Sequence, residues 1–294
     1  MANGPIEAAR GAAHTARLLI SCPDGPGIVA AVSRFLYERG ANIVTSDQYS
    51  TDPEHGTFFM RTAFYLPTVE QDAAGFEAAF GALAERFEMQ WKVSYARERR
   101  RAALMASRED HCLLDLLWRQ RRGELEFDIT SVISNHQALR GEVESLGVPY
   151  HHIPVTRETK PQAEAQAIEL LAGNVELVVL ARYMQILSSG FLRDVGCPVI
   201  NIHHSFLPAF AGADPYHRAY ERGVKLIGAT AHYATEVLDE GPIIDQDVQR
   251  VGHGYTVDDL VRIGRDLERM VLARAVRSHL DDRVLVHEGR TIVF

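Results

Sequence analysis

The pattern of apolar and polar positions predicts two successive series of elements along the 294-residue chain. In the first hundred residues it predicts the order strand, helix, strand, strand, helix, strand, at residues 15–22, 28–39, 42–50, 57–65, 69–87 and 89–95. This order is that of a ferredoxin-like βαββαβ fold, an antiparallel sheet with two helices on one face.

From residue 102 onward, strands alternate with helices, which predicts a doubly wound, mostly parallel sheet and an α/β class for the whole chain. The expected strands are 102–106, 128–135, 148–154, 177–181, 199–203, 225–233 and 243–248. The clearest helices are 113–121, 161–171 and 257–279, and two short strands near Val284 and Ile292 are expected to form a hairpin.

The same pattern predicts the domain organisation. Residues 1–12, rich in Ala and Gly, read as a flexible tail, and residues 13–97 as a small first domain. Residues 98–102 lie in a charged run without apolar periodicity and are expected to be a linker. Residues 102–294 then form the larger, second domain.

The stretch from Val199 to His217 is the first candidate for a functional site. A short apolar run leads into Asn201, His203 and His204, and the periodicity then stops at a proline and a glycine. Ligands of open α/β sheets bind beyond the carboxyl ends of strands, so polar groups placed there suggest an active site. Such residues also cap ordinary loops, and this stretch alone leaves both readings open.

A carboxylate that could serve the histidine follows the strand predicted at 225–233. Asp239 lies in a turn containing Gly and Pro, and that strand is expected to neighbour the strand ending at His203, which would place Asn201, His203 and Asp239 at adjacent strand ends. An amide N–H and an imidazolium N–H can stabilise an oxyanion, while an aspartate can hold a water or take its proton. Taken alone, Asp239 also fits a turn-capping role.

Composition and net charge indicate which class of partner the protein binds. The net charge of −8 and a pI near 5.9 disfavour nucleic-acid and membrane surfaces, so a small-molecule partner is expected. No leader and no long apolar run is visible, and the three cysteines are far apart, which predicts a cytoplasmic protein without disulfides.

Other chemistries find little support in the motifs. The strand at 102–106 is not followed by a glycine-rich nucleotide loop, so no nucleotide cofactor is expected. The histidines near the candidate site lie on different elements without metal-ligand spacing, so no metal is expected; they are His203, His204, His217 and His232. Ser205 lacks the elbow motif of a serine nucleophile.

Residues 14–96, with the segment Ser-Cys-Pro-Asp-Gly-Pro-Gly-Ile-Val at the first turn, resemble an ACT domain. The resemblance implies a regulatory domain that pairs between chains, hence a homo-oligomer, and an amino-acid effector held near Asp24, Gly25 and Gly27. The glycines allow close backbone approach, and the next helix offers free N–H groups to a carboxylate. A simple tight turn remains the alternative.

From residue 102 the chain resembles the folate-dependent formyltransferase fold. The resemblance rests on Asn201-Ile-His203, on Asp239 lying 36 positions after the histidine, and on Asp-Glu-Gly-Pro-Ile-Ile at 239–244. Within that superfamily, four features look like the formyltetrahydrofolate deformylase family: the segments 132–135, 181–187 and 203–210, and the preceding ACT-like domain. This family hydrolyses 10-formyltetrahydrofolate to tetrahydrofolate and formate, which implies a role in formate supply for purine synthesis and no cofactor beyond the folate substrate.

The resemblance also implies residue roles. Asp239 would position and deprotonate the water, Asn201 and His203 would stabilise the oxyanion, and His203 would help to protonate N10. The expected substrate contacts are Arg182, Tyr183, Met184, Ile186, Leu187, Ser205, Ala234 and Glu240.

Two alternatives remain open at this stage. One is a formyltransferase that uses an amine acceptor, as glycinamide ribonucleotide transformylases do with a phosphate-binding loop after the first strand. Here Ser107–His111 contains two carboxylates, which would repel a phosphate. The other is a non-catalytic folate or amino-acid sensor, against which the intact triad argues. Ala211, where the family often has Lys, leaves loop closure and substrate affinity undetermined.

Overall fold

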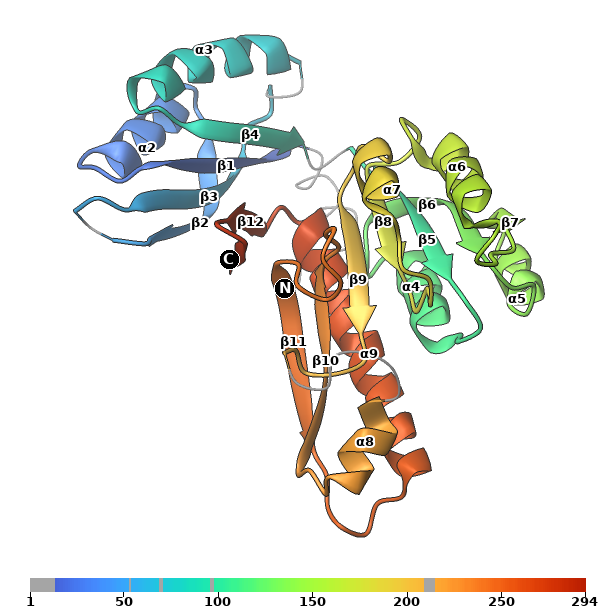
Figure 1. Cartoon of the computed structure of the whole chain (residues 1–294). Coiled ribbons are helices and arrows are strands. Elements are labelled where there is room, and N and C mark those ends of the chain that lie inside the picture. The colour runs from blue at the N-terminus through green and yellow to red at the C-terminus, as the bar shows by residue number, and fades with distance from the viewer. Residues whose placement is uncertain (1–13, 53, 69–70, 96–97, 209–214) are drawn as a thin grey trace, which may run out of the picture. The chain divides into compact units, whose positions relative to one another are not determined.

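The computed structural model describes residues 14–52, 54–68, 71–95, 98–208 and 215–294. The chain divides into two compact units, one up to Arg99 and one from Arg100 to Val293 (Figure 1). The tail predicted at 1–12 and Ala211 lie outside the described residues, whereas the linker predicted at 98–102 is described and overlaps a strand that begins at Arg100.

The first unit is a four-stranded antiparallel sheet with two helices on one face (Figure 1). Its strands are β1 (Thr15–Pro23), β2 (Asn42–Ser50), β3 (Thr57–Tyr65) and β4 (Gln90–Tyr95), in the order β2-β3-β1-β4. Helices α2 (Ile28–Glu38) and α3 (Ala73–Arg86) join them in the predicted βαββαβ sequence. Helix α3 begins later than predicted because the Asp72 side chain caps it, accepting a hydrogen bond from the Gly75 N–H.

The second unit is built on a seven-stranded sheet, as predicted mostly parallel, with the order β11-β10-β9-β8-β5-β6-β7. Its strands are β5 (Arg100–Ala106), β6 (Phe127–Ser134), β7 (Tyr150–His152), β8 (Leu177–Leu180), β9 (Val199–His203), β10 (Leu226–Tyr233) and β11 (Ile243–Arg250). Strand β10 is antiparallel to both of its neighbours, whereas the other pairs are parallel. A separate hairpin, β12 (Val284–His287) and β13 (Arg290–Val293), ends the chain as predicted.

Helices cover both faces of this sheet and enclose two apolar cores. On one face lie α4 (His111–Arg121), α5 (Arg140–Ser145), α8 (Pro215–Glu221) and the long α9 (Val257–Leu280), and on the other lie α6 (Lys160–Leu171) and α7 (Ser189–Asp194). A capping box between Thr256 and Asp259 starts α9. The short helices α5, α7 and α8 were not predicted, because six or seven residues span too few turns to show a helical period.

The sheet positions the polar residues that follow its strands. The carboxyl ends of β5, β6, β8 and β9 lie at one edge, and Ser107, Asn135, Arg182 and His204 come directly after or close to these ends. Strand β10 neighbours β9 as predicted, but it runs antiparallel, with Thr230 opposite His203. The carboxyl end of β10 therefore does not lie beside the carboxyl end of β9, contrary to the prediction. Asp239 reaches the site from the loop between β10 and β11 instead. Among the described residues no helix is both long enough and apolar enough to cross a membrane.

Candidate active site

Strand β9 supplies two of the three predicted catalytic side chains. Asn201 and His203 are two residues apart in a strand, so both project from the same face. His203 is buried, with 6% of its surface exposed, and Asn201 is partly buried. The extended backbone of a β-branched, apolar strand therefore fixes the spacing of this pair.

Asp239 joins them from the loop between β10 and β11. This loop folds back on β9: the N–H of Ala234 donates to the Val199 carbonyl at 2.8 Å, and the Tyr233 N–H donates to the Pro242 carbonyl at 3.0 Å. Asp239 has a positive φ of 60°, a conformation that costs energy for a residue other than glycine. Its Oδ1 lies 3.2 Å from His203 Nδ1, and both side chains are at least nine-tenths buried.

Gly241 makes this loop conformation possible. A Cβ placed on it would lie 1.7 Å from the Tyr233 carbonyl oxygen and 3.1 Å from His232 Nδ1. The Gly-Pro pair therefore does more than end a strand, because it lets the backbone returning from Asp239 pass directly over the end of β10.

His232 also belongs to the site, where no local sequence motif predicts it. Its Nδ1 is 2.9 Å from the Tyr233 carbonyl, which can only accept, so Nδ1 carries the proton. In the neutral ring, Nε2 then accepts from the Asn201 amide at 3.2 Å, and it lies 3.9 Å from Asp239 Oδ1. His232 thus orients the Asn201 amide. The register that places it opposite Asn201 depends on the antiparallel pairing, which no local motif signals.

Burial keeps the histidines of the site neutral. It lowers the pKa of His203 despite the opposing effect of Asp239, and it lowers the pKa of His232 as well. The pKa of His204 falls to about 3, through burial and then the Arg182 charge. The free protein therefore holds a neutral His203 where we expected an imidazolium. Its Nε2 is buried and has no hydrogen-bond partner among the described residues.

A cavity of about 270 Å³ opens beside these groups. Its lining includes the three predicted catalytic residues and six of the predicted substrate contacts: Arg182, Tyr183, Met184, Ile186, Leu187 and Ala234. Two predicted contacts lie elsewhere: Ser205 lines a second cavity with Tyr216, and Glu240 is exposed outside the lining. The side chains of Met184 and Ile186 are more than half exposed, so the cavity has an apolar rim.

The ends of β5 and β6 hold one wall of this cavity in place. The buried Ser107 hydroxyl donates to Asn135 Oδ1 at 2.7 Å and accepts from the Met184 N–H at 2.9 Å. The Ser107 N–H donates to the Arg182 carbonyl at 3.2 Å. Segment 182–187 is therefore fixed at its start by a buried polar network.

The predicted effector residues lie in the first unit. Asp24 accepts a hydrogen bond from the Ser50 hydroxyl at 2.5 Å, and Gly27 precedes α2 with a φ of 92°. Gly27 at the N-cap of α2 makes no side-chain cap hydrogen bond, and the N–H groups of a first helical turn can bind a carboxylate. Effector binding at Asp24, Gly25 and Gly27 stays a prediction.

One group of side chains in the second unit has metal-ligand types, namely His111, Cys112 and Glu268. The Glu268 carboxylate already accepts from His111 and from Tyr216, and the Arg182 guanidinium lies 3.3 Å from it. Burial also raises the pKa of the Cys112 thiol well above its usual value. A cation would compete with a fixed positive charge here, and the group does not fit a metal ion.

Comparisons with known proteins identify the family of the chain. A family model described as formyl transferase matches residues 100–276, and one described as ACT domain matches residues 16–72. The formyltetrahydrofolate deformylase of Mycobacterium tuberculosis is 60% identical over 96% of this chain and 91% of its own, and that of Bacillus subtilis is 53% identical over 95% and 93%. The chain belongs to the formyltetrahydrofolate deformylase family.

Solved structures place the family likeness over both units. A formyltetrahydrofolate deformylase from Pseudomonas syringae has a TM-score of 0.90 and 52% identity, over 95% of this chain and 94% of its own. Glycinamide ribonucleotide transformylase 1 from Symbiobacterium toebii has a TM-score of 0.62 and 30% identity, over 67% of this chain and 94% of its own. Both predicted resemblances, to the ACT domain and to the formyltransferase fold, are confirmed.

The substitution Gly241→Ala should destabilise the protein, because the added methyl cannot fit against the Tyr233 carbonyl. We expect a loss of about 1–3 kcal/mol in the free energy of unfolding, measured by chemical denaturation. Gly254→Ala is the matched control, since no atom lies within 4 Å of the added Cβ. Equal stability of the two variants would contradict the packing described here.

Titration of the histidines by NMR should follow the burial of each ring. His203 and His232 should take up protons below the usual pKa of about 6.5, and His204 should stay neutral until the pH approaches 3. Asp239→Asn removes the negative charge that favours the imidazolium, so it should lower the pKa of His203 further. If His203 titrated above its usual range, the effect of Asp239 would outweigh that of burial, contrary to this prediction.

Proposed function

We propose that this protein hydrolyses 10-formyltetrahydrofolate to tetrahydrofolate and formate. The observation that carries the proposal is the convergence of Asn201, His203 and Asp239 on one cavity, with a buried His203 Nε2 that has no hydrogen-bond partner in the part of the chain that the structure describes. Relatives 53–60% identical over nearly the whole chain are named for this reaction. An amide, an imidazole and a carboxylate are sufficient for it, and no covalent nucleophile is needed.

The proposed chemistry begins with a water held by Asp239 and His203. As the water oxygen bonds to the formyl carbon, its proton passes to the Asp239–His203 pair, and His203 becomes an imidazolium beside a carboxylate at 3.2 Å. The Asn201 N–H and the new His203 N–H stabilise the oxyanion. The C–N10 bond then breaks and His203 returns the proton to N10, which leaves tetrahydrofolate and formic acid, and the acid loses its proton to solvent as formate. The neutral resting histidine is thus the form that can accept the proton.

The folate is proposed to bind between segment 182–187 and the loop 234–239. Residues of both segments line the cavity, and the apolar rim suits a flat aromatic ring with polar edges. Because Ser205 and Glu240 lie outside the lining, we propose the contacts for the other six predicted residues. No cofactor is required by this scheme.

Water as the acceptor is supported by the loop after β5, though not by simple charge repulsion. Glu109 is paired with Arg265 at 2.6 Å, so its charge is largely compensated. His111 is bonded to Glu268 at 2.8 Å, so the loop is occupied by its own ionic contacts. A bound acceptor phosphate would have to displace these contacts, whereas a water needs no such site.

The direct test is formate release from 10-formyltetrahydrofolate without any added amine. Asp239→Asn should lower kcat by at least about 10³-fold, because the water loses one of the two groups that hold it and the imidazolium loses its negative partner. Asp266→Asn, at an exposed ion pair on α9, should change kcat by less than about 2-fold. Product formation that depends strictly on an amine would refute the proposal, as would an Asp239→Asn variant with full activity.

The first unit is proposed to regulate the reaction. An ACT match over residues 16–72 suggests an amino-acid effector and assembly into a homo-oligomer through these domains. We expect glycine or methionine to change formate release and light scattering to show more than a monomer. A monomer that responds to neither amino acid would contradict this part.

The same proposal places the enzyme in the cytoplasm, where its formate would supply purine synthesis.

A further inference from the structure

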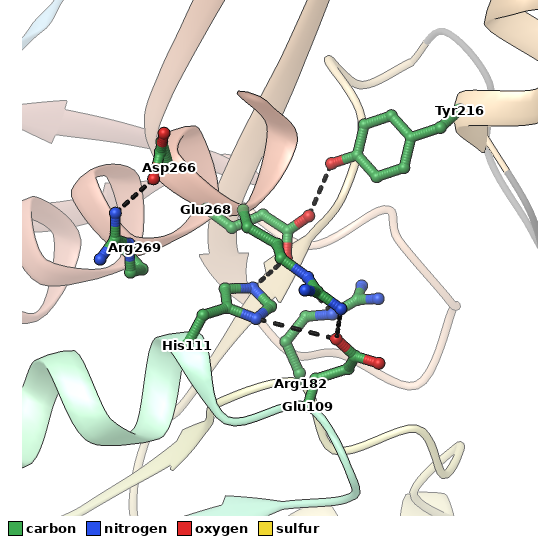
Figure 2. Close-up of polar contacts among 8 residues, drawn as sticks. Glu109, His111, Arg182, Tyr216, Asp266, Glu268 and Arg269 are labelled. Carbon is green, nitrogen blue, oxygen red and sulfur yellow. Dashed lines mark hydrogen bonds and ion pairs between the residues drawn. The ribbon is translucent and has the colours of Figure 1, made fainter. Parts of the chain in front are cut away.

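One carboxylate in the second unit connects three elements around the site. Glu268 on α9 is 1% exposed, and its Oε1 accepts from the hydroxyl of Tyr216 on α8 at 2.6 Å. Its Oε2 lies 2.8 Å from His111 Nε2 at the start of α4 and 3.3 Å from Arg182 Nε, just after β8 (Figure 2). None of these contacts is used in the mechanism above.

The carboxylate is charged. Burial acts to raise the pKa of Glu268, but the hydrogen bond from His111 and the charge of Arg182 outweigh it, and the pKa is lowered. At neutral pH, Glu268 and Arg182 are therefore an ion pair shielded from water, and removing one member leaves the charge of the other uncompensated.

The sequence of α9 is adapted to this arrangement. Gly264 lies one turn before Glu268, and a Cβ placed on it would come within 2.0 Å of the Tyr216 hydroxyl. Glycine is a poor residue for the middle of a helix. Its presence there leaves the space through which the Tyr216 ring reaches the carboxylate.

Arg182 connects this pair to the reacting groups. Its side chain lines the cavity with His203 and His204, and its carbonyl accepts from Ser107, which also holds Met184. Its φ of 64° starts the segment proposed to hold the pteridine. The backbone of Arg182 thus takes part in holding the cavity wall, and its guanidinium is a fixed positive charge that acts to lower the pKa of His203.

We propose that Glu268 is a positioning residue that acts through Arg182: it anchors the guanidinium and balances its charge, so that His203 stays basic enough to take the proton of water. This inference rests on the proposed hydrolysis. The charged or titratable groups that act on His203 are Asp239 from the loop after β10, His232 from β10, Arg182 after β8, Glu268 from α9 and the adjacent His204. Only Asp239 and Glu268 among them are negative, so the balance depends on both.

The test uses Glu268→Gln in the full chain, which keeps the size of the side chain and removes its charge. In the pH profile of kcat/KM, the acid limb, where activity falls as His203 takes up a proton, should move to lower pH by about 0.5–1 unit. The reason is that the uncompensated charge of Arg182 disfavours the imidazolium. The kcat at neutral pH should fall about 10-fold, since a weaker base accepts the proton less readily. An unshifted limb would overturn the proposal, even if the variant melts at a lower temperature.

Two further variants separate charge from packing. Tyr216→Phe removes a hydrogen bond to Glu268 but no charge, and it should leave the limb within about 0.2 unit of the wild type. Arg182→Gln should move the limb to higher pH. In that background the further change Glu268→Gln should shift the limb less than it does in the wild type, because no charge is left for Glu268 to balance. A shift of the same size in both backgrounds would show that Glu268 acts on His203 directly and not through Arg182.

The proposal can still be tested if Glu268→Gln does not fold or if the wild type shows no turnover. If Glu268→Gln does not fold, the shift of Arg182→Gln to higher pH decides the matter, and no shift refutes the proposal. If the wild type releases no formate, the proposed function fails, but the pKa of His203 can still be followed by NMR without substrate. Glu268→Gln should lower this pKa, and an unchanged value would overturn the positioning role independently of turnover.

Discussion

The contact between Asp239 and His203 is the interaction on which the rest of the site depends. Two groups at 3.2 Å in a buried setting need a backbone that holds them there, and this backbone is unfavourable in itself: a left-handed aspartate and a glycine pressed against a carbonyl. The cost is offset by the sheet, because the ends of the loop are hydrogen-bonded to β9 and β10. The scaffold thus stabilises a geometry that the loop would not adopt alone.

The charges around this contact alternate in sign with increasing distance along the chain of contacts from His203. Asp239 acts on His203 directly, Arg182 opposes it, and Glu268 balances Arg182 from within α9. His232 sets the amide of Asn201 while staying neutral itself. A proton can move within such a set without leaving an unpaired charge in the interior, where charges are costly.

Much of this could be predicted from the sequence. The periods of the apolar residues predict both units, and the spacing of Asn201, His203 and Asp239 gives the candidate site. Three features depend on three-dimensional pairing and could not be predicted. The antiparallel β10 brings His232 opposite Asn201, burial removes the charge expected on His203, and Glu109 finds a partner 156 residues away. Ser205 and Glu240 are close in sequence to His203 and Asp239, yet neither lines the cavity: Ser205 lies in the loop after β9 and lines a second cavity, and Glu240 is exposed.

The antiparallel direction of β10 has a consequence for how this fold carries its chemistry. Antiparallel neighbours such as β10 and β11 can be joined by a turn of about two residues. The chain instead spends residues 234–242 on the connection, and Asp239 is among them. The pairing of β10 with β11 does not require a connection of this length, and the extra residues bring the Asp239 carboxylate to His203. A change within the loop is therefore expected to move this carboxylate, while the pairing of the strands, which has its own hydrogen bonds, persists.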